Sequence, residues 1–163
     1  MIVILMGVSG SGKTTIGMCM AERVGWIFAD ADDYFPRSMK QKMAAGHPLT
    51  DEDRWPWLDR IGARLARGKR TVVACSALRR AYRDRLRAAA GPKLRFVYLE
   101  ATPEEMRARV AGRVGHYMPA SLVDSQFAAL EPPRDEPDVI TISAHADLDE
   151  EIPRLAERLR RGR

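Results

Sequence analysis

Cysteine and histidine are scarce in this chain, which holds two cysteines and three histidines in 163 residues. Cys19 and Cys75 lie in apolar contexts without a second ligand at metal-binding spacing, so we expect core thiols rather than a disulfide or a metal site. Long hydrophobic runs are missing as well, since none approaches the roughly 20 residues that cross a membrane. The N-terminal run Met1–Met6 has no basic leader and ends at a glycine, so it does not resemble a secretory signal. We therefore expect a cytoplasmic protein without a membrane role.

Aromatic residues are also few, at 7% of the chain, and this limits how the positive charge can be interpreted. The net charge is +5, and Asp84 is the only acid in the dense basic stretch from Arg79 to Arg95. Proteins that bind single-stranded nucleic acid interleave such charge with aromatic side chains that stack on bases, and this pattern is missing here. We therefore expect no nucleic acid partner and interpret the stretch as a site for small anions. A nucleotide-binding regulatory or nucleic-acid-linked protein is the alternative from a different class.

Short β-rich runs alternate with longer helical runs along the whole chain. This order predicts a parallel sheet covered by helices on both faces. The stripe of apolar residues in Lys13–Val24 predicts the first helix, and the sequence Thr-Pro-Glu-Glu at residues 102–105 predicts a capping box at the start of another. The expected strands are short and largely apolar, as strands buried on both faces are, and they cover Ile2–Met6, Trp26–Asp30, Thr71–Cys75, Arg95–Leu99 and Asp138–Ile142.

A phosphate-binding motif stands directly between the first expected strand and the first expected helix. Residues 7–14 match G-x-x-x-x-G-K-[ST], and this strand-to-helix context is the one that the motif requires. Its glycines let backbone N–H groups turn towards phosphate oxygens, while the lysine bridges the β- and γ-phosphates and the hydroxyl faces Mg²⁺. We therefore expect ATP and Mg²⁺ as cofactors, with Lys13 also catalytic, and a nucleotide site made of Gly7, Val8, Ser9, Gly10, Ser11, Gly12, Lys13, Thr14 and Thr15.

Three aspartates follow the second expected strand, whereas the third expected strand ends at Ser76 without an acid. If the segment stays extended, alternation places Asp30 and Asp32 on one side and Asp33 on the other. We predict that Asp32 is catalytic and accepts the proton of a substrate hydroxyl, and that Asp30 and Thr14 form the metal site. Asp33 stays open as the alternative base, and a solvated acidic turn is the alternative for all three.

The motifs continue into longer blocks that resemble the bacterial gluconokinases of the small P-loop type. The resemblance runs nearly end to end, and two of its blocks are selective: residues 48–58, which read Pro-Leu-x-Asp-x-Asp-Arg-x-Pro-Trp-Leu, and Cys75–Leu78. Family members often carry His and Asn where this chain has Phe35 and Met39, and Lys where it has Arg79. The other blocks that carry the resemblance are Gly7–Lys13, Asp30–Pro36, Lys42–Met43, Gly46–His47, Tyr82–Arg83, Gly115–Met118, Ser125–Phe127 and Leu130–Glu131.

The resemblance implies a fold, an activity and an assembly. The fold is the three-layer α/β/α P-loop kinase fold shared with shikimate and nucleoside monophosphate kinases, with a five-stranded parallel sheet. It implies one domain over residues 1–163, with a helical substrate-binding insert over about 36–65 and a lid over about 109–121. The implied reaction transfers the γ-phosphoryl group of ATP to D-gluconate, giving 6-phospho-D-gluconate, and the implied assembly is a homodimer. A kinase for another small hydroxy acid, such as shikimate, is the alternative within this class.

Arginines are the expected ligands of the anionic groups. Arg54 can clamp a carboxylate or pair with nearby acids, whereas Arg83 favours anion binding because almost nothing acidic surrounds it in sequence. Arg109 and Arg113 are four residues apart and share a helix face, so we expect both to bind the nucleotide and Arg113 to act on the transferred phosphoryl group. The expected substrate-binding residues are Asp32, Arg54, Ser76, Arg79, Arg83, His116 and Gln126, of which His116 has a structural lid role as its alternative.

Overall fold

The computed structural model describes residues 1–45, 47, 49–111 and 120–161, and its centre is a five-stranded parallel sheet. The expected α/β fold is confirmed, and each strand begins and ends within one residue of its predicted bounds. Along the sheet the strand order is β2-β3-β1-β4-β5. The strands are β1 (Ile2–Met6), β2 (Ile27–Asp30), β3 (Thr71–Ala74), β4 (Leu94–Glu100) and β5 (Val139–Ser143).

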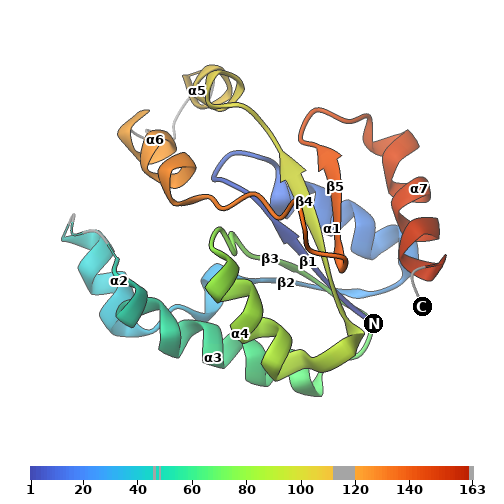
Figure 1. The fold of residues 1–163 in the computed structure, drawn as a ribbon, viewed down its shortest axis with the longest axis horizontal. Coiled ribbons are helices and arrows are strands. Elements are labelled where there is room, and N and C mark those ends of the chain that lie inside the picture. The colour runs from blue at the N-terminus through green and yellow to red at the C-terminus, as the bar shows by residue number, and fades with distance from the viewer. Residues whose placement is uncertain (46, 48, 112–119, 162–163) are drawn as a thin grey trace.

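Helices cover both faces of this sheet (Figure 1). Along β1, Ile4 faces one apolar cluster and Leu5 faces the other, as the two-residue period of a strand requires. The first cluster packs against α3 (Asp51–Arg67) and α4 (Arg80–Ala90), and the second against α1 (Lys13–Val24) and α7 (Leu148–Arg161). The remaining described elements are α2 (Arg37–Ala44), α5 (Pro103–Ala111), α6 (Ala120–Ala129) and two 3-10 turns at Ala31–Tyr34 and Gly91–Lys93.

Burial on both faces holds for the central strands but not for β2. Every residue of β1 is 0% exposed, whereas Ile27 of β2 is 57% exposed. The prediction of five strands buried on both faces is therefore wrong at this edge, because β2 pairs only with β3 and has no neighbour on its other side. Within the described part of the chain, no helix is long and apolar enough to span a membrane.

The ends of β1 and β3 mark a topological switch point at the carboxyl edge of the sheet, which is where open α/β sheets form a crevice. From β1 the chain crosses β3 to reach β2, whereas from β3 it crosses β1 to reach β4, so the two connections leave in opposite directions. Ligands of open α/β sheets bind at such a switch point. The loops that follow these strands contact each other here, since the N–H of Gly7 donates to the carbonyl oxygen of Ser76 over 3.2 Å.

Candidate active site

The loop between β1 and α1 is shaped for phosphate. Gly7 has φ +145° and Gly12 has φ +96°, a backbone region that side chains with a Cβ rarely adopt. A Cβ at Gly7 would also come within 3.0 Å of the carbonyl oxygen of Leu99. Ser11 Oγ is buried and lacks a hydrogen-bond partner among the described residues. An unsatisfied hydroxyl beside the uncapped N-terminus of α1 fits a loop that takes its remaining partners from a phosphate ligand.

Lys13 lies between this loop and the acidic turn after β2. Its Nζ donates to the carbonyl oxygen of Val8 over 2.9 Å. Burial lowers the pKa of Lys13 below its ordinary value, and the carboxylates of Asp32 and Asp30 act in the opposite direction. The lysine therefore stands where it can neutralise phosphate charge next to both carboxylates.

The acidic turn differs from its predicted geometry. Strand β2 ends at Asp30, and Ala31–Tyr34 form a 3-10 turn, so the predicted alternation along an extended segment is wrong. Asp30 shapes the turn itself, because its Oδ1 accepts the N–H of Asp32 over 3.0 Å. Asp30 and Asp32 still act on Lys13 together, but the curvature of the turn brings them there. Burial and the neighbouring Asp30 carboxylate raise the pKa of Asp32, while Lys13 opposes the shift.

A hydroxyl and a carboxylate meet at the predicted metal site. Thr14 Oγ1 donates to Asp30 Oδ2 over 3.0 Å, which links the first turn of α1 to the end of β2. Thr15, the next residue of α1, is exposed. Among the described residues, no three His, Cys, Asp or Glu side chains gather closely enough to hold a metal ion by themselves. Thr14 and Asp30 suit Mg²⁺, which takes one or two protein oxygens and completes its shell with water and substrate phosphates.

Two arginines lie near the start of α3, one paired with Asp51 and the other beside the ring of Tyr82. A capping box between Thr50 and Asp53 fixes the first turn of the helix. Asp51 accepts from Arg79 Nη1 over 3.1 Å and from the hydroxyl of Tyr82. Arg54 donates to the carbonyl oxygens of Leu49 and Thr50, and its guanidinium lies 5.8 Å from the centre of the Tyr82 ring.

These contacts bear on the expected roles of Arg54 and Arg79. The hydrogen bonds of the Arg54 side chain end on the backbone carbonyls of Leu49 and Thr50 rather than on Asp51 or Asp53. Arg79 remains 43% exposed although it pairs with Asp51. In the described part of the chain, the hydrogen bonds of Arg54 thus leave its charge without a carboxylate partner, which suits an anionic ligand.

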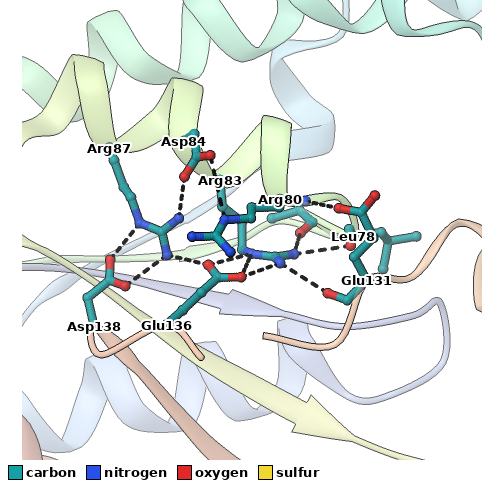
Figure 2. Close-up of polar contacts among 9 residues, drawn as sticks. Leu78, Arg80, Arg83, Asp84, Arg87, Glu131, Glu136 and Asp138 are labelled. Carbon is teal, nitrogen blue, oxygen red and sulfur yellow. Dashed lines mark hydrogen bonds and ion pairs between the residues drawn. The ribbon is translucent and has the colours of Figure 1, made fainter. Parts of the chain in front are cut away.

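The expectation that Arg83 binds substrate is wrong. Arg83 is 1% exposed, and all three of its guanidinium nitrogens donate to protein oxygens (Figure 2). Its ion-pair partner is Glu136, 53 residues away in sequence, where an inspection of the surrounding sequence cannot find it. A guanidinium whose donors are occupied inside the protein has no capacity left for a ligand.

Two predicted ligands contact the phosphate loop directly. Gln126 Oε1 accepts the N–H of Ser9 over 2.5 Å, so Gln126 contacts the phosphate loop, and its expected binding of the acceptor stays a prediction. Arg109 Nη1 donates to the carbonyl oxygen of Gly10 over 3.0 Å, and its binding of the nucleotide stays a prediction. Arg113 and His116 lie outside the described residues, as does most of the expected lid.

Several residues around the site escaped the sequence interpretation. His145 Nδ1 lies 3.0 Å from Arg109 Nη2. Trp57 Nε1 donates to the carbonyl oxygen of Ala31 within the acidic turn. Asp51 holds both Arg79 and Tyr82. No local signal marks these contacts, since each joins segments that are distant in sequence.

Comparison with known proteins gives one consistent result. Residues 2–133 match the family described as AAA domain. The gluconokinase of Gluconobacter oxydans is 42% identical, with 90% of this chain and 84% of that protein covered. A crystal structure of a gluconokinase from Sinorhizobium meliloti superposes with a TM-score of 0.86 at 43% identity, over 97% of this chain and 94% of the other. A shikimate kinase from Bacteroides thetaiotaomicron, with a TM-score of 0.68 at 17% identity over 98% of each chain, shares the fold alone.

The family match over residues 2–133 includes the phosphate loop, the acidic turn and the arginine pair. The chain belongs to the gluconokinase family of P-loop kinases.

Proposed function

We propose that this protein transfers the γ-phosphoryl group of ATP to D-gluconate, giving 6-phospho-D-gluconate and ADP. The observation that carries the proposal is the meeting of Lys13 and Thr14 with the carboxylates of Asp30 and Asp32 at one crevice. This arrangement places phosphate-binding groups next to a carboxylate that can receive a hydroxyl proton. The names of the relatives support gluconate as the acceptor.

On the donor side, the backbone N–H groups of residues 7–14 and the N-terminus of α1 hold the phosphates. Lys13 exchanges its bond to the carbonyl oxygen of Val8 for phosphate oxygens, since a lysine is a flexible point charge. Arg109 and Gln126 border this side, and Arg113 is proposed to meet the charge that develops on the transferred phosphoryl group. Mg²⁺, held through Thr14 and Asp30, supplies charge neutralisation between the phosphates when bound.

On the acceptor side, Asp32 orients the hydroxyl and accepts its proton. A raised pKa makes this carboxylate a better proton acceptor than an ordinary aspartate. Arg54 and Arg79 bind the carboxylate end of the acid, with Ser76 and His116 as further ligands. Arg54, whose hydrogen bonds end on backbone carbonyls, and the partly exposed Arg79 support this assignment.

Two alternatives are open to the same experiment. Shikimate or another small hydroxy acid would suit the same crevice, because it also offers a hydroxyl and a carboxylate. Phe35 and Met39 stand where family members often carry His and Asn. Phe35 packs against Trp57 with ring centres 5.0 Å apart. Met39 is 2% exposed and belongs to the core. A regulatory nucleotide-binding protein would bind ATP without turning over any acid.

The test is a panel of sugar acids assayed by ADP release, with ³¹P NMR of the product. We expect release that depends on D-gluconate and Mg²⁺ and a new phosphate monoester at the primary hydroxyl. Strong turnover of shikimate with none of gluconate would replace the acceptor. ATP binding without acid-dependent release, together with salt-dependent binding of DNA or RNA, would replace the class of function.

We also propose that the protein is a cytoplasmic homodimer without a nucleic acid partner. We propose that the chain forms a single domain with an insert and a lid. Light scattering at several protein concentrations tests the dimer, for which a mass of twice 18.3 kDa is the expected result.

A further inference from the structure

The buried ion pair of Arg83 and Glu136 lies outside the ligand-binding role that the sequence suggested. Arg83 Nε donates to Glu136 Oε2 over 2.9 Å, and Nη2 donates to Oε1 over 2.5 Å, so the pair is bidentate. Arg87 joins from the next turn of α4 and binds both Glu136 and Asp138 (Figure 2). Burying a charged pair is costly unless every donor and acceptor is satisfied. The other hydrogen-bond partners of Arg83 are therefore part of what keeps the pair buried.

Its remaining donors hold the turn that follows β3. Arg83 Nη1 donates to the carbonyl oxygens of Ala77 and Leu78 over 2.9 and 3.1 Å. Ala77 has φ +42°, in the left-handed region that a residue with a Cβ seldom occupies. Strained backbone of this kind persists only where its surroundings enforce it. The guanidinium fork supplies that constraint, because it binds both carbonyls from one rigid plane.

The turn also receives support from the segment between α6 and β5. The N–H of Glu131 donates to the carbonyl oxygen of Leu78 over 2.9 Å, and the carboxylate of Glu131 accepts the N–H of Arg80 over 2.5 Å. Arg83 Nη2 donates to the carbonyl oxygen of Glu131 as well. One buried side chain therefore joins the turn, the start of α4 and the 130–138 segment.

Both ends of the turn lead to the candidate site. Ser76 at its beginning accepts the N–H of Gly7 from the phosphate loop. Arg79 at its end pairs with Asp51, on the acceptor side of the crevice. The backbone between these residues is the part that Arg83 binds.

We propose that Arg83 is a positioning residue for the acceptor site, which sets Ser76 and Arg79 by holding the Ala77–Leu78 backbone through its pair with Glu136. Arg83 does not touch the ligand and acts only through the turn. The inference rests on the proposed function for the identity of the acceptor, but not for the geometry of the turn.

The variant that tests it is Arg83→Lys. Lysine keeps a positive charge opposite Glu136, so no buried carboxylate is left alone, but its single nitrogen cannot span Glu136 and the two carbonyls. Arg85→Lys is the matched control on the same helix. Arg85 also forms a bidentate pair, with Nε and Nη2 at 2.6 and 2.8 Å from the two oxygens of Asp59, and its ring contact is with Trp55 rather than with the turn.

Two readouts separate positioning from simple stability. In steady-state kinetics with D-gluconate, we expect Arg83→Lys to raise the KM of the acceptor about tenfold and to change the Kd of MgATP by less than about threefold. In the free protein, we expect faster hydrogen exchange at the N–H of Gly7 and of Arg80, which are bonded to the turn and to Glu131. Arg85→Lys should change neither quantity.

Each other outcome overturns the proposal. A lower melting temperature with unchanged acceptor KM and unchanged exchange would reduce Arg83 to a structural residue. Equal losses for acceptor and MgATP would show that the turn does not serve the acceptor in particular. If the unmodified protein fails to phosphorylate gluconate, the proposed function fails. In that case the comparison of hydrogen exchange between Arg83→Lys and Arg85→Lys still tests whether Arg83 holds the turn.

Discussion

The indole Nε1 of Trp57 donates to the carbonyl oxygen of Ala31 over 2.7 Å, which ties α3 to the turn that carries Asp32. Trp57 is 3% exposed, so water cannot replace this bond. Trp57→Phe keeps an aromatic ring and removes the donor, leaving a buried carbonyl unpaired. We expect a loss of about 1–3 kcal/mol in the free energy of unfolding and a lower kcat, with little change in the KM of ATP.

Trp55→Phe is the control for this prediction. Trp55 belongs to the same helix and packs edge-on against Tyr82, with ring centres 5.6 Å apart, but is not bonded to the turn. Urea unfolding and steady-state kinetics of both variants make the comparison. Equal kcat values for the two would show that the hydrogen bond does not orient Asp32.

We expect Asp32 to lower the stability of the fold and to be required for full activity. Because its folded pKa is raised above the ordinary 3.8, the fold disfavours the ionised form, and stability falls as pH rises through that window. Asp32→Asn removes the charge and keeps the shape. We expect a higher melting temperature at pH 7 and a kcat reduced by a factor of about 10² or more, with unchanged ATP affinity.

Asp33→Asn is the matched neighbour and should be much milder in single-turnover assays with gluconate. If Asp33→Asn shows the large loss and Asp32→Asn the small one, the base is Asp33.

Lys13 should be dispensable for folding and required for phosphoryl transfer. Burial lowers its pKa, so the ionised side chain is a cost to the folded state rather than a support. Lys13→Met should therefore retain or raise the melting temperature and abolish ADP release. The exposed Lys40 of α2 provides the control, Lys40→Met, with near-normal turnover. Substantial turnover by a folded Lys13→Met protein would contradict the mechanism.

Glu136 should govern part of the acid sensitivity of the fold. Burial would raise its pKa, but the hydrogen bonds from Arg83 and Arg87 outweigh this and hold the pKa below the ordinary 4.5. A depressed pKa contributes stability that is present above the ordinary value and is lost as pH falls through the folded one. Glu136→Gln leaves Arg83 without its charge partner, so we expect a loss of about 3–5 kcal/mol at pH 7.

The difference between Glu136→Gln and the unmodified protein should shrink on acidification below pH 4.5, as the pH falls through the lowered pKa of Glu136. Thermal unfolding between pH 3 and 7 measures this. Glu157→Gln, in an exposed pair with Arg161, should lie within about 0.5 kcal/mol of the unmodified protein at every pH. A constant gap for Glu136→Gln across the range would mean that its carboxylate does not titrate with the fold.

The sequence alone was sufficient for the sheet, the phosphate loop and the start of α5. The short β-rich runs, the Gly-rich loop and the capping box between Thr102 and Glu105 each involve a few neighbouring residues. The structure contains all three. Local steric and hydrogen-bonding preferences are enough to specify such features, because the interacting groups are already close along the chain.

Only the tertiary structure decided the roles of the charged residues. Within the stretch from Arg79 to Arg95, Asp84 is the only acid in sequence, yet Asp51, Glu136 and Asp138 come to it from distant segments. Arg83 thus changed from an expected ligand to a buried support. The geometry around Asp30 depends likewise on α1 and on the curvature of the turn. Ion pairs and site geometry form between segments that folding brings together, so the neighbours of a residue in sequence do not predict them.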